Sequence, residues 1–394
     1  MTIHNFDEII DRRGSNSFKW DLFSKEALPM WVADMDFKVP APITSALHQA
    51  VDHAVFGYSM ESKELRNNVV TRMKKLYGWE IDESWIVTTT GLVSAFFAAA
   101  DLLCKDQGGY LIQTPVYMPF NQLQDAFGIT RQENALLPVI TGNKINYQFD
   151  AGNFSAAFHT GGVRTKMFLL CNPHNPVGKC YSRDELAIMA EKCLENEAII
   201  VSDEIHSELL LDGNKHIPIA TLSKEIENNT ITLVSPSKTF NIAGLFCGFA
   251  IIANEDLRKK YKKTVERMTL HVSGLSLVAA QAAFSGECDE WLGDLNTYLT
   301  LNRNHLVSRL TADLPELITT VPQATYLGWL GFGEPIEKGK LTGEPNEYLY
   351  KRGHIVLNNG AAFGPGGEKF ARINFGCPRS LLDDGIDRIM DALK

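Results

Sequence analysis

The sequence lacks the features that mark several large classes of protein. It has 394 residues, of which 45% are hydrophobic, yet its longest apolar runs, 92–103 and 244–253, are too short or interrupted to span a bilayer. The seven cysteines are odd in number, scattered, and form no C-x-x-C pair, which argues against a disulfide framework and a zinc site. No internal repeat or low-complexity tract is visible. The chain therefore reads as a globular protein without a metal site.

An excess of positive charge is also missing. The formal net charge is −9 and the sequence pI is about 5.6, so neither nucleic acid nor an anionic membrane surface is an expected partner. Residues 1–11 contain acidic side chains and no apolar core segment, and we expect no signal peptide. Unpaired cysteines without a leader predict a cytoplasmic location.

The chain is long enough for two domains and an extension. Residues 1–45 look irregular and predict an N-terminal arm; its dense patch at 29–37 fits either a segment packed at a site or an edge strand with a turn. Residues 46–285 alternate strand and helix patterns and predict a large domain. Residues 286–394 begin with a long amphipathic helix over 290–313 and predict a smaller C-terminal domain.

Polar residues follow several short apolar runs in the large domain. Strands are expected at 85–88, 110–112, 167–170, 198–201 and 232–234. In open α/β sheets, ligands bind beyond the carboxyl ends of the strands. The residues directly after these runs are therefore the candidates for a site.

The first three runs lead into different kinds of turn. Gly91 precedes a predicted helix, whose free N–H groups could bind an anion, although many such turns bind nothing. Tyr117 could stack on a flat ring or cap the core. The segment 172–178 holds two Asn-Pro steps, which fix a rigid loop and could aim the amide of Asn175 at a ligand.

The last two runs end in a carboxylate and a lysine. Asp203 could hold a proton on a ring nitrogen or merely cap a turn. Pro236 must end the strand that precedes Lys238, and Ser235 and Ser237 offer hydroxyls suited to phosphate. A lysine that loses its proton can condense with a carbonyl group, whereas an isolated loop lysine is usually solvated.

An arginine and a tyrosine complete the candidate set. Arg372 alternates with Phe370 and Asn374 along a predicted strand, and an arginine in a half-buried strand usually has a carboxylate partner. Tyr58 lies between two predicted helices and is explained equally well by packing.

In this order, the motifs resemble the fold type I pyridoxal-phosphate (PLP) enzymes of the class I/II aminotransferase superfamily, over nearly the whole chain. Segments 172–178 (NPHNPVG), 202–206 (SDEIH), 235–244 (SPSKTFNIAG) and 29–37 (PMWVADMDF) look like the cystathionine β-lyase (carbon–sulfur lyase) branch. The resemblance implies an α/β fold: a large domain with a mostly parallel seven-stranded sheet flanked by helices, and a smaller α+β C-terminal domain. It also implies PLP as the cofactor.

The resemblance implies roles for individual residues. Lys238 would bind the cofactor covalently and move the Cα proton, Asp203 would keep the pyridine nitrogen protonated, and Arg372 would hold the substrate carboxylate. Further cofactor contacts would come from the ring neighbours and the phosphate site, namely Asn175, Tyr117, His206, Gly91, Leu92, Val93, Ser235 and Ser237. Asn175 would also face the substrate, and Tyr117 would also take part in the reaction.

Tyr58 would serve the phosphate, the substrate and the reaction in the other subunit, which implies a homodimer with shared active sites. Two positions depart from the aminotransferase pattern: Phe246 replaces an arginine eight residues after the lysine, and His206 replaces a tyrosine three residues after Asp203. Both departures favour the lyase branch.

The leading hypothesis is β-elimination from a sulfur-containing amino acid such as L-cystathionine, L-cysteine or another S-substituted cysteine, which yields a thiol, pyruvate and ammonia. An aminotransferase is the alternative, separated by its need for a keto acid. A protein-binding regulatory role on the same scaffold is a second alternative.

Overall fold

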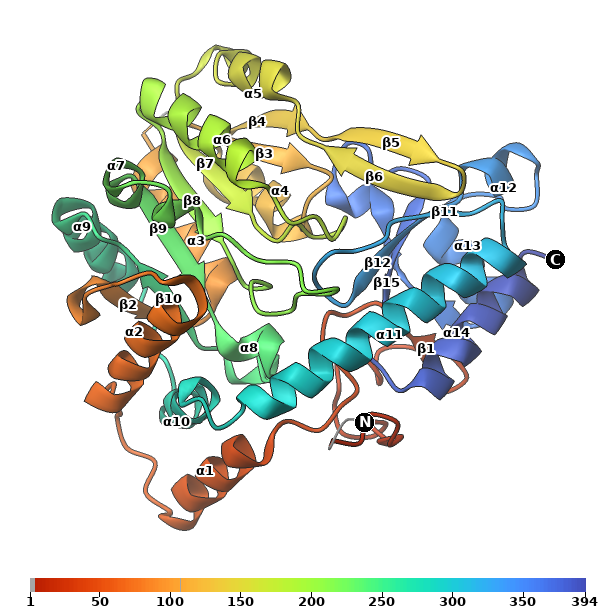
Figure 1. Ribbon diagram of the computed structural model, residues 1–394, viewed down its shortest axis with the longest axis horizontal. Helices are drawn as coiled ribbons and strands as arrows, with labels where there is room; N and C mark the ends of the chain where they lie inside the picture. The colour runs from red at the N-terminus through yellow and green to blue at the C-terminus, as the bar shows by residue number, and fades with distance from the viewer. Residues whose placement is uncertain (1–3, 107) are drawn as a thin grey trace.

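The computed structural model describes residues 4–106 and 108–394, and its centre is a seven-stranded sheet (Figure 1). The strand order is β2-β10-β9-β8-β7-β3-β4, and β10 alone runs antiparallel to its neighbours. This confirms the mostly parallel sheet expected from the sequence. The strands are Ile86–Thr89 (β2), Gly109–Thr114 (β3), Thr130–Ala135 (β4), Thr165–Cys171 (β7), Ile199–Asp203 (β8), Thr230–Val234 (β9) and Gly248–Ile251 (β10).

Both faces of this sheet are covered by helices, which explains why its central strands are continuously apolar. Successive side chains of β7 enter opposite layers: Leu169 packs with the layer of α3, α4 and α9, whereas Phe168 and Leu170 pack with that of α5 and α6. These helices span Leu92–Cys104 (α3), Met118–Phe127 (α4), Ala151–Ala157 (α5), Arg183–Glu195 (α6) and Glu255–Arg267 (α9). Ser182 and Glu185 form a capping box at the start of α6.

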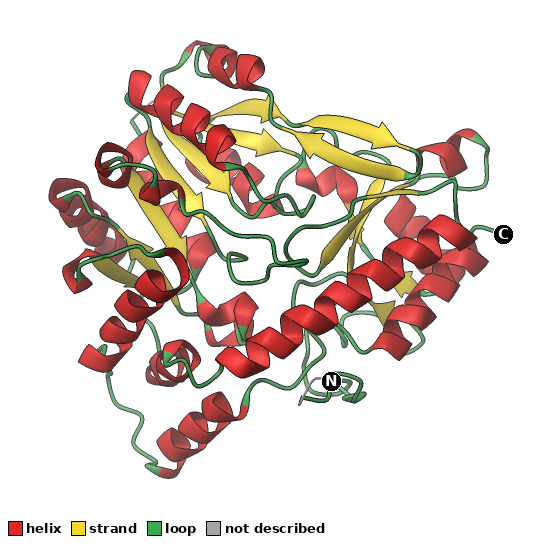
Figure 2. Cartoon of the chain, in the orientation of Figure 1, coloured by secondary structure: helices red, strands yellow, loops and turns green. Residues whose placement is uncertain are grey.

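A second sheet lies toward the C-terminal end of the fold, with strand order β14-β15-β12-β11-β6-β5 (Figure 2). Its strands are Leu137–Thr141 (β5), Lys144–Gln148 (β6), Ile318–Thr319 (β11), Leu327–Gly331 (β12), Asn358–Asn359 (β14) and Phe370–Asn374 (β15). The hairpin of β5 and β6 comes from the middle of the chain and joins this sheet through the pairing of Lys144 with Thr319. The proposed domain boundary at residue 285 therefore leaves one hairpin of the large domain in the second sheet.

Two helices in the C-terminal part of the chain pack side by side (Figure 1). The long helix α11 spans Asp289–Asp313, close to the position expected from the amphipathic pattern, and α14 spans Arg379–Ala392. Leu295 and Leu306 of α11 are buried in one cluster with Ile386 of α14. Two shorter helices, Gly333–Glu337 (α12) and Pro345–Gly353 (α13), complete this region.

The N-terminal residues contribute one strand to a third sheet, which has two short strands. Leu28–Pro29 (β1) pairs in parallel with Ile355–Val356 (β13), and the chain then crosses to the central sheet. It continues into Ala41–Asp52 (α1) and Lys63–Tyr77 (α2), which lie near Gly274–Phe284 (α10). Two short helices, Lys224–Asn228 (α7) and Pro236–Thr239 (α8), precede and follow β9. No helix among the described residues is long and apolar enough to cross a membrane.

Candidate active site

The candidate residues converge at the carboxyl edge of the central sheet. Strand β8 ends at Asp203, and β9 leads through Ser235 into α8, which carries Lys238. Beyond neighbouring strands lie Asn175 and Tyr117, which are joined by a hydrogen bond of 3.0 Å from the Tyr117 N–H to the Asn175 carbonyl. The parallel directions of β3, β7, β8 and β9 bring these residues to one place.

Lys238 is held by the N-terminal arm. Its Nζ donates to the carbonyl of Ala33 at 2.5 Å. Burial lowers the pKa of Lys238 to about 8, with Arg372 lowering it further and Asp34 and Asp203 opposing the shift. An amine with this pKa is partly neutral near pH 7–8 and can act as a nucleophile or a base.

Asp203 is a buried carboxylate at the end of β8. It accepts a hydrogen bond of 3.1 Å from the Ile205 N–H. Burial raises its pKa to about 7, the charge of Glu204 adds to the shift and that of Lys238 opposes it. Asp203 forms no ion pair with any residue in the described ranges 4–106 and 108–394. A cation placed against Asp203 would therefore restore its ionised form, as the protonated nitrogen of a pyridine ring does.

Arg372 is a buried cation without a carboxylate partner in the described chain. It donates to the side-chain oxygens of Asn175 and Asn358 at 3.0 and 2.6 Å and to the Trp31 carbonyl at 3.1 Å. Its Nε has no partner, and burial lowers its pKa to about 10. The partner expected for a strand arginine is thus not supplied by these residues, and a ligand carboxylate would satisfy it.

His206 and Tyr117 complete the surroundings of the lysine and the arginine. His206 is buried against Tyr326, with ring centroids 6.1 Å apart, and its Nδ1 has no partner among the described residues. Burial lowers the pKa of His206 to about 3, so its ring is neutral. Burial also raises the pKa of Tyr117, against the influence of Arg372. Both side chains are therefore neutral groups at this edge of the sheet.

The residues expected to bind a phosphate lie where α3, α8 and β10 approach one another. Gly91 is the N-cap of α3, at φ 120°, and the approach is close enough that a Cβ on Gly248 would lie 2.6 Å from Leu92 Cδ1. From the other side, Ser235 Oγ donates to the Cys247 carbonyl at 2.6 Å. Ser235 Oγ also lies 2.9 Å from Ser237 Oγ. Because Cys247 and Gly248 are neighbours in sequence, these two serines and the N–H groups at the start of α3 lie near the same end of β10.

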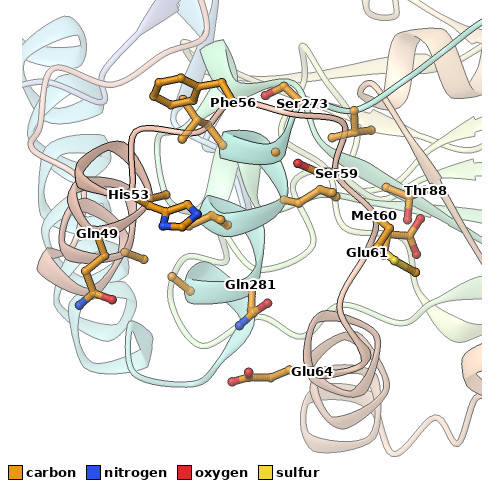
Figure 3. Close-up of a pocket in the computed structure, with 18 of the residues that line it drawn as sticks. Gln49, His53, Phe56, Ser59, Met60, Glu61, Glu64, Thr88, Ser273 and Gln281 are labelled. Carbon is orange, nitrogen blue, oxygen red and sulfur yellow. The ribbon is translucent and has the colours of Figure 1, made fainter.

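The side chains of Val93 and Tyr58 are exposed in the single chain. Val93 is 38% exposed, and the Tyr58 side chain is fully exposed in the loop between α1 and α2. Beside this loop is a groove of about 1690 Å³ lined mainly by α1, α10 and their flanking residues. Figure 3 shows Phe56, Ser59 and Met60 of the loop on one side and Gln281 of α10 on another.

Phe246, which stands where aminotransferases have an arginine, is 66% exposed. It adopts a left-handed conformation with φ 39°. No group of three or more histidine, cysteine or acidic side chains is arranged to hold a metal ion in residues 4–106 and 108–394.

Several contacts at the site involve groups that no sequence motif identifies. The carbonyls of Trp31 and Ala33 receive Arg372 and Lys238, and any residue type could supply a carbonyl. Asn358 reaches Arg372 because β14 and β15 pair these two residues directly. Tyr326 was also missed; its hydroxyl donates to the Ala33 carbonyl at 2.8 Å.

Comparison with known families decides the assignment. The family "Aminotransferase class I and II" matches residues 33–389. The chain belongs to this family. It is 37% identical to the cystathionine β-lyase PatB of Bacillus subtilis over 99% of this chain and 100% of the relative.

Two solved structures are similar to this chain in fold as well as in sequence. The PLP-bound C–S lyase of Staphylococcus hominis has a TM-score of 0.91 at 32% identity and covers 99% of this chain and 98% of its own. Cystalysin of Treponema denticola, which contains PLP, has a TM-score of 0.92 at 30% identity, with 100% and 99% covered.

PLP is the cofactor of this enzyme, and the side chains at the sheet edge fit it. Lys238 supplies an amine, Asp203 a carboxylate without a cation, and the start of α3 free N–H groups. The buried Nδ1 of His206 and Nε of Arg372 remain available for a ligand.

Proposed function

We propose that this class I/II family member is a carbon–sulfur lyase that catalyses β-elimination from L-cystathionine, L-cysteine or another S-substituted cysteine. The products would be a thiol, pyruvate and ammonia. The observation that carries the proposal is the convergence of Lys238, Asp203 and the unpaired Arg372 at one sheet edge. The names of PatB and the Staphylococcus hominis enzyme support the lyase reaction over the others in the family.

Arg372 would bind the α-carboxylate of the amino acid. A guanidinium and a carboxylate form two parallel hydrogen bonds, which fix the orientation of the substrate as well as its position. Asn358 and the Trp31 carbonyl already orient the guanidinium. The amide of Asn175, whose oxygen accepts from Arg372, would present its Nδ2 to the 3-oxygen of the cofactor.

Bound PLP supplies an electron sink that acidifies the Cα–H bond of the amino acid. Lys238 would remove this Cα proton, for which its lowered pKa of about 8 is suited. The Cβ–S electron pair would then leave with the sulfur as a thiolate. The released three-carbon enamine hydrolyses in water to pyruvate and ammonia, so no second substrate is consumed.

The other side chains would hold the cofactor. Asp203 would accept the hydrogen bond from the ring nitrogen, Tyr117 would cover a face of the ring, and His206 would contact it as a neutral group. The phosphate would be bound by the backbone of Gly91, Leu92 and Val93 with Ser235 and Ser237.

We further propose a cytoplasmic homodimer in which Tyr58 serves the neighbouring subunit. The proposed dimer rests on the full exposure of Tyr58 in a loop beside the groove of α1 and α10. Tyr58 is far too exposed to contribute to the site of its own chain. It would contribute to a site only if a second subunit placed that subunit's Lys238 beside Tyr58.

The deciding experiment is elimination without a keto acid. The purified enzyme and L-cystathionine should give pyruvate, ammonia and a free thiol in equal amounts, with L-alanine, which lacks a leaving group, as the control substrate. Turnover that requires an added keto acid would identify an aminotransferase instead and overturn the lyase proposal.

A further inference from the structure

Residues 31–37, called here the arm segment, cross the candidate active site between β1 and α1. Its main-chain carbonyls receive side chains from three other parts of the fold. These contacts run from Trp31 to Arg372, from Val32 and Asp34 to Asn374, from Ala33 to Lys238 and Tyr326, and from Met35 and Phe37 to Asn241.

Asn374 holds the peptide groups on both sides of Ala33. It is 1% exposed, lies two residues after Arg372, and its Nδ2 donates to the Val32 and Asp34 carbonyls at 2.7 Å each. The peptide group that carries the Ala33 carbonyl lies between these two bound peptide groups, so its orientation is fixed as well. The Ala33 carbonyl then points to Lys238.

Asn241 holds the other end of the arm segment. It lies three residues after Lys238 and adopts a left-handed conformation with φ 56°, which asparagine tolerates better than most residues. Its Nδ2 donates to the Met35 and Phe37 carbonyls at 2.9 Å each, and its Oδ1 accepts from the Met35 N–H at 2.9 Å. Lys238 and Arg372 are therefore each followed, within three residues, by an asparagine that binds the arm segment.

We propose that Asn241 and Asn374 are positioning residues that hold the arm segment so that its Ala33 carbonyl receives Lys238 and its Trp31 carbonyl receives Arg372. This deepens the proposed elimination and rests on it. Lysine becomes an ammonium when it accepts the Cα proton, and a buried ammonium needs an oxygen acceptor. The Ala33 carbonyl is that acceptor.

The charged groups around Lys238 come from several elements. Asp34 on the arm segment and Asp203 on β8 favour its ammonium form, and Arg372 on β15 disfavours it; the neighbouring His206 is neutral. None of them is replaced when Asn241 or Asn374 is changed. A shift in Lys238 titration in those variants would therefore report displacement of the arm segment, which carries both the Ala33 carbonyl and Asp34.

The test compares Asn374→Ala and Asn241→Gly with Asn302→Ala. Glycine keeps the left-handed conformation at 241 without strain. Asn302 is a matched control because it is equally buried and donates to two carbonyls, those of Phe375 and Cys377, but not to the arm segment. Asn374→Ser replaces Asn374→Ala if the alanine variant does not fold.

Two readouts are needed. In the elimination assay, both arm variants should lose about 10- to 100-fold in kcat/KM, while Asn302→Ala should change kcat/KM less than about threefold. In the cofactor-free full chain, amine-reagent labelling of Lys238 across pH should give a pKa lower than wild type in the arm variants and unchanged in Asn302→Ala.

The outcomes separate this inference from the proposed function. An inactive wild type with the expected labelling shift would overturn the lyase proposal but keep the positioning role in the protein. Unchanged labelling in both arm variants, or an equal shift in Asn302→Ala, would overturn the positioning role.

Discussion

Replacing Arg372 by alanine should impair substrate binding far more than cofactor binding. The guanidinium is 2% exposed, and it is the group proposed to hold the substrate carboxylate. Removing one partner of such a buried charge pair costs on the order of 2–5 kcal/mol. At about 1.4 kcal/mol per power of ten, kcat/KM should fall by roughly one and a half to three and a half powers of ten.

The assay is steady-state pyruvate formation, with the absorbance spectrum of bound PLP recorded on the same sample. Most of the loss should appear as a raised KM, because the carboxylate contact exists before and during the reaction. Arg372→Lys should recover only part of it, because an ammonium cannot form the two-pronged pair.

Arg303→Ala is the matched control. Arg303, which lies on α11, is also 2% exposed. It donates to the Pro322 carbonyl and forms an ion pair with Asp212. Its loss should reduce stability and leave KM nearly unchanged. Normal kinetics in Arg372→Ala, or an equal rise of KM in Arg303→Ala, would refute the assignment of Arg372 to the substrate.

Two further predictions concern the cofactor site and the assembly. Folding raises the pKa of Asp203 from 3.8 to about 7, so the folded chain retains a proton there that the unfolded chain releases, and this stabilisation is present below pH 4 and lost as the pH rises through 7. The cofactor-free Asp203→Asn variant should therefore gain stability in urea over wild type at pH 8 but not at pH 4; an equal difference at both values would contradict the raised pKa. Tyr58→Ala and Lys238→Ala, each inactive alone, should recover part of the activity when mixed and allowed to exchange subunits, and failure with exchange confirmed would place Tyr58 outside the neighbour's site.

Much of the central sheet could be predicted because its signals are local. Buried parallel strands need continuous apolar runs, and those of β7, β8 and β9 end in turn residues that mark their limits. The convergence of Asp203 and Lys238 then follows from the strand directions alone. The same reasoning identified Arg372 from its alternation within β15.

The remaining features depend on contacts that are distant in sequence or that use the main chain. The arm patch at 29–37 suggested either a strand or a segment at a site, and the structure contains both, because β1 ends at Pro29 and the carbonyls of Trp31 and Ala33 face the site. Nothing in residues 137–148 indicates that their partner is Thr319. The alternation around Arg372 predicted a carboxylate partner without showing whether the chain or a ligand supplies it. The resemblance implied the substrate, and among the described residues Arg372 donates only to amide and carbonyl oxygens.

The hairpin of β5 and β6 has a consequence for synthesis on the ribosome. Lys144 is translated well over a hundred residues before its partner Thr319, so the nascent chain must carry the hairpin with one edge unpaired while α6 to α11 are still being made. All of β5 is exposed even in the finished fold, including Leu137 and Ile140. An emerging apolar edge of this kind is a natural target for chaperones, and truncation before β11 would leave it permanently open.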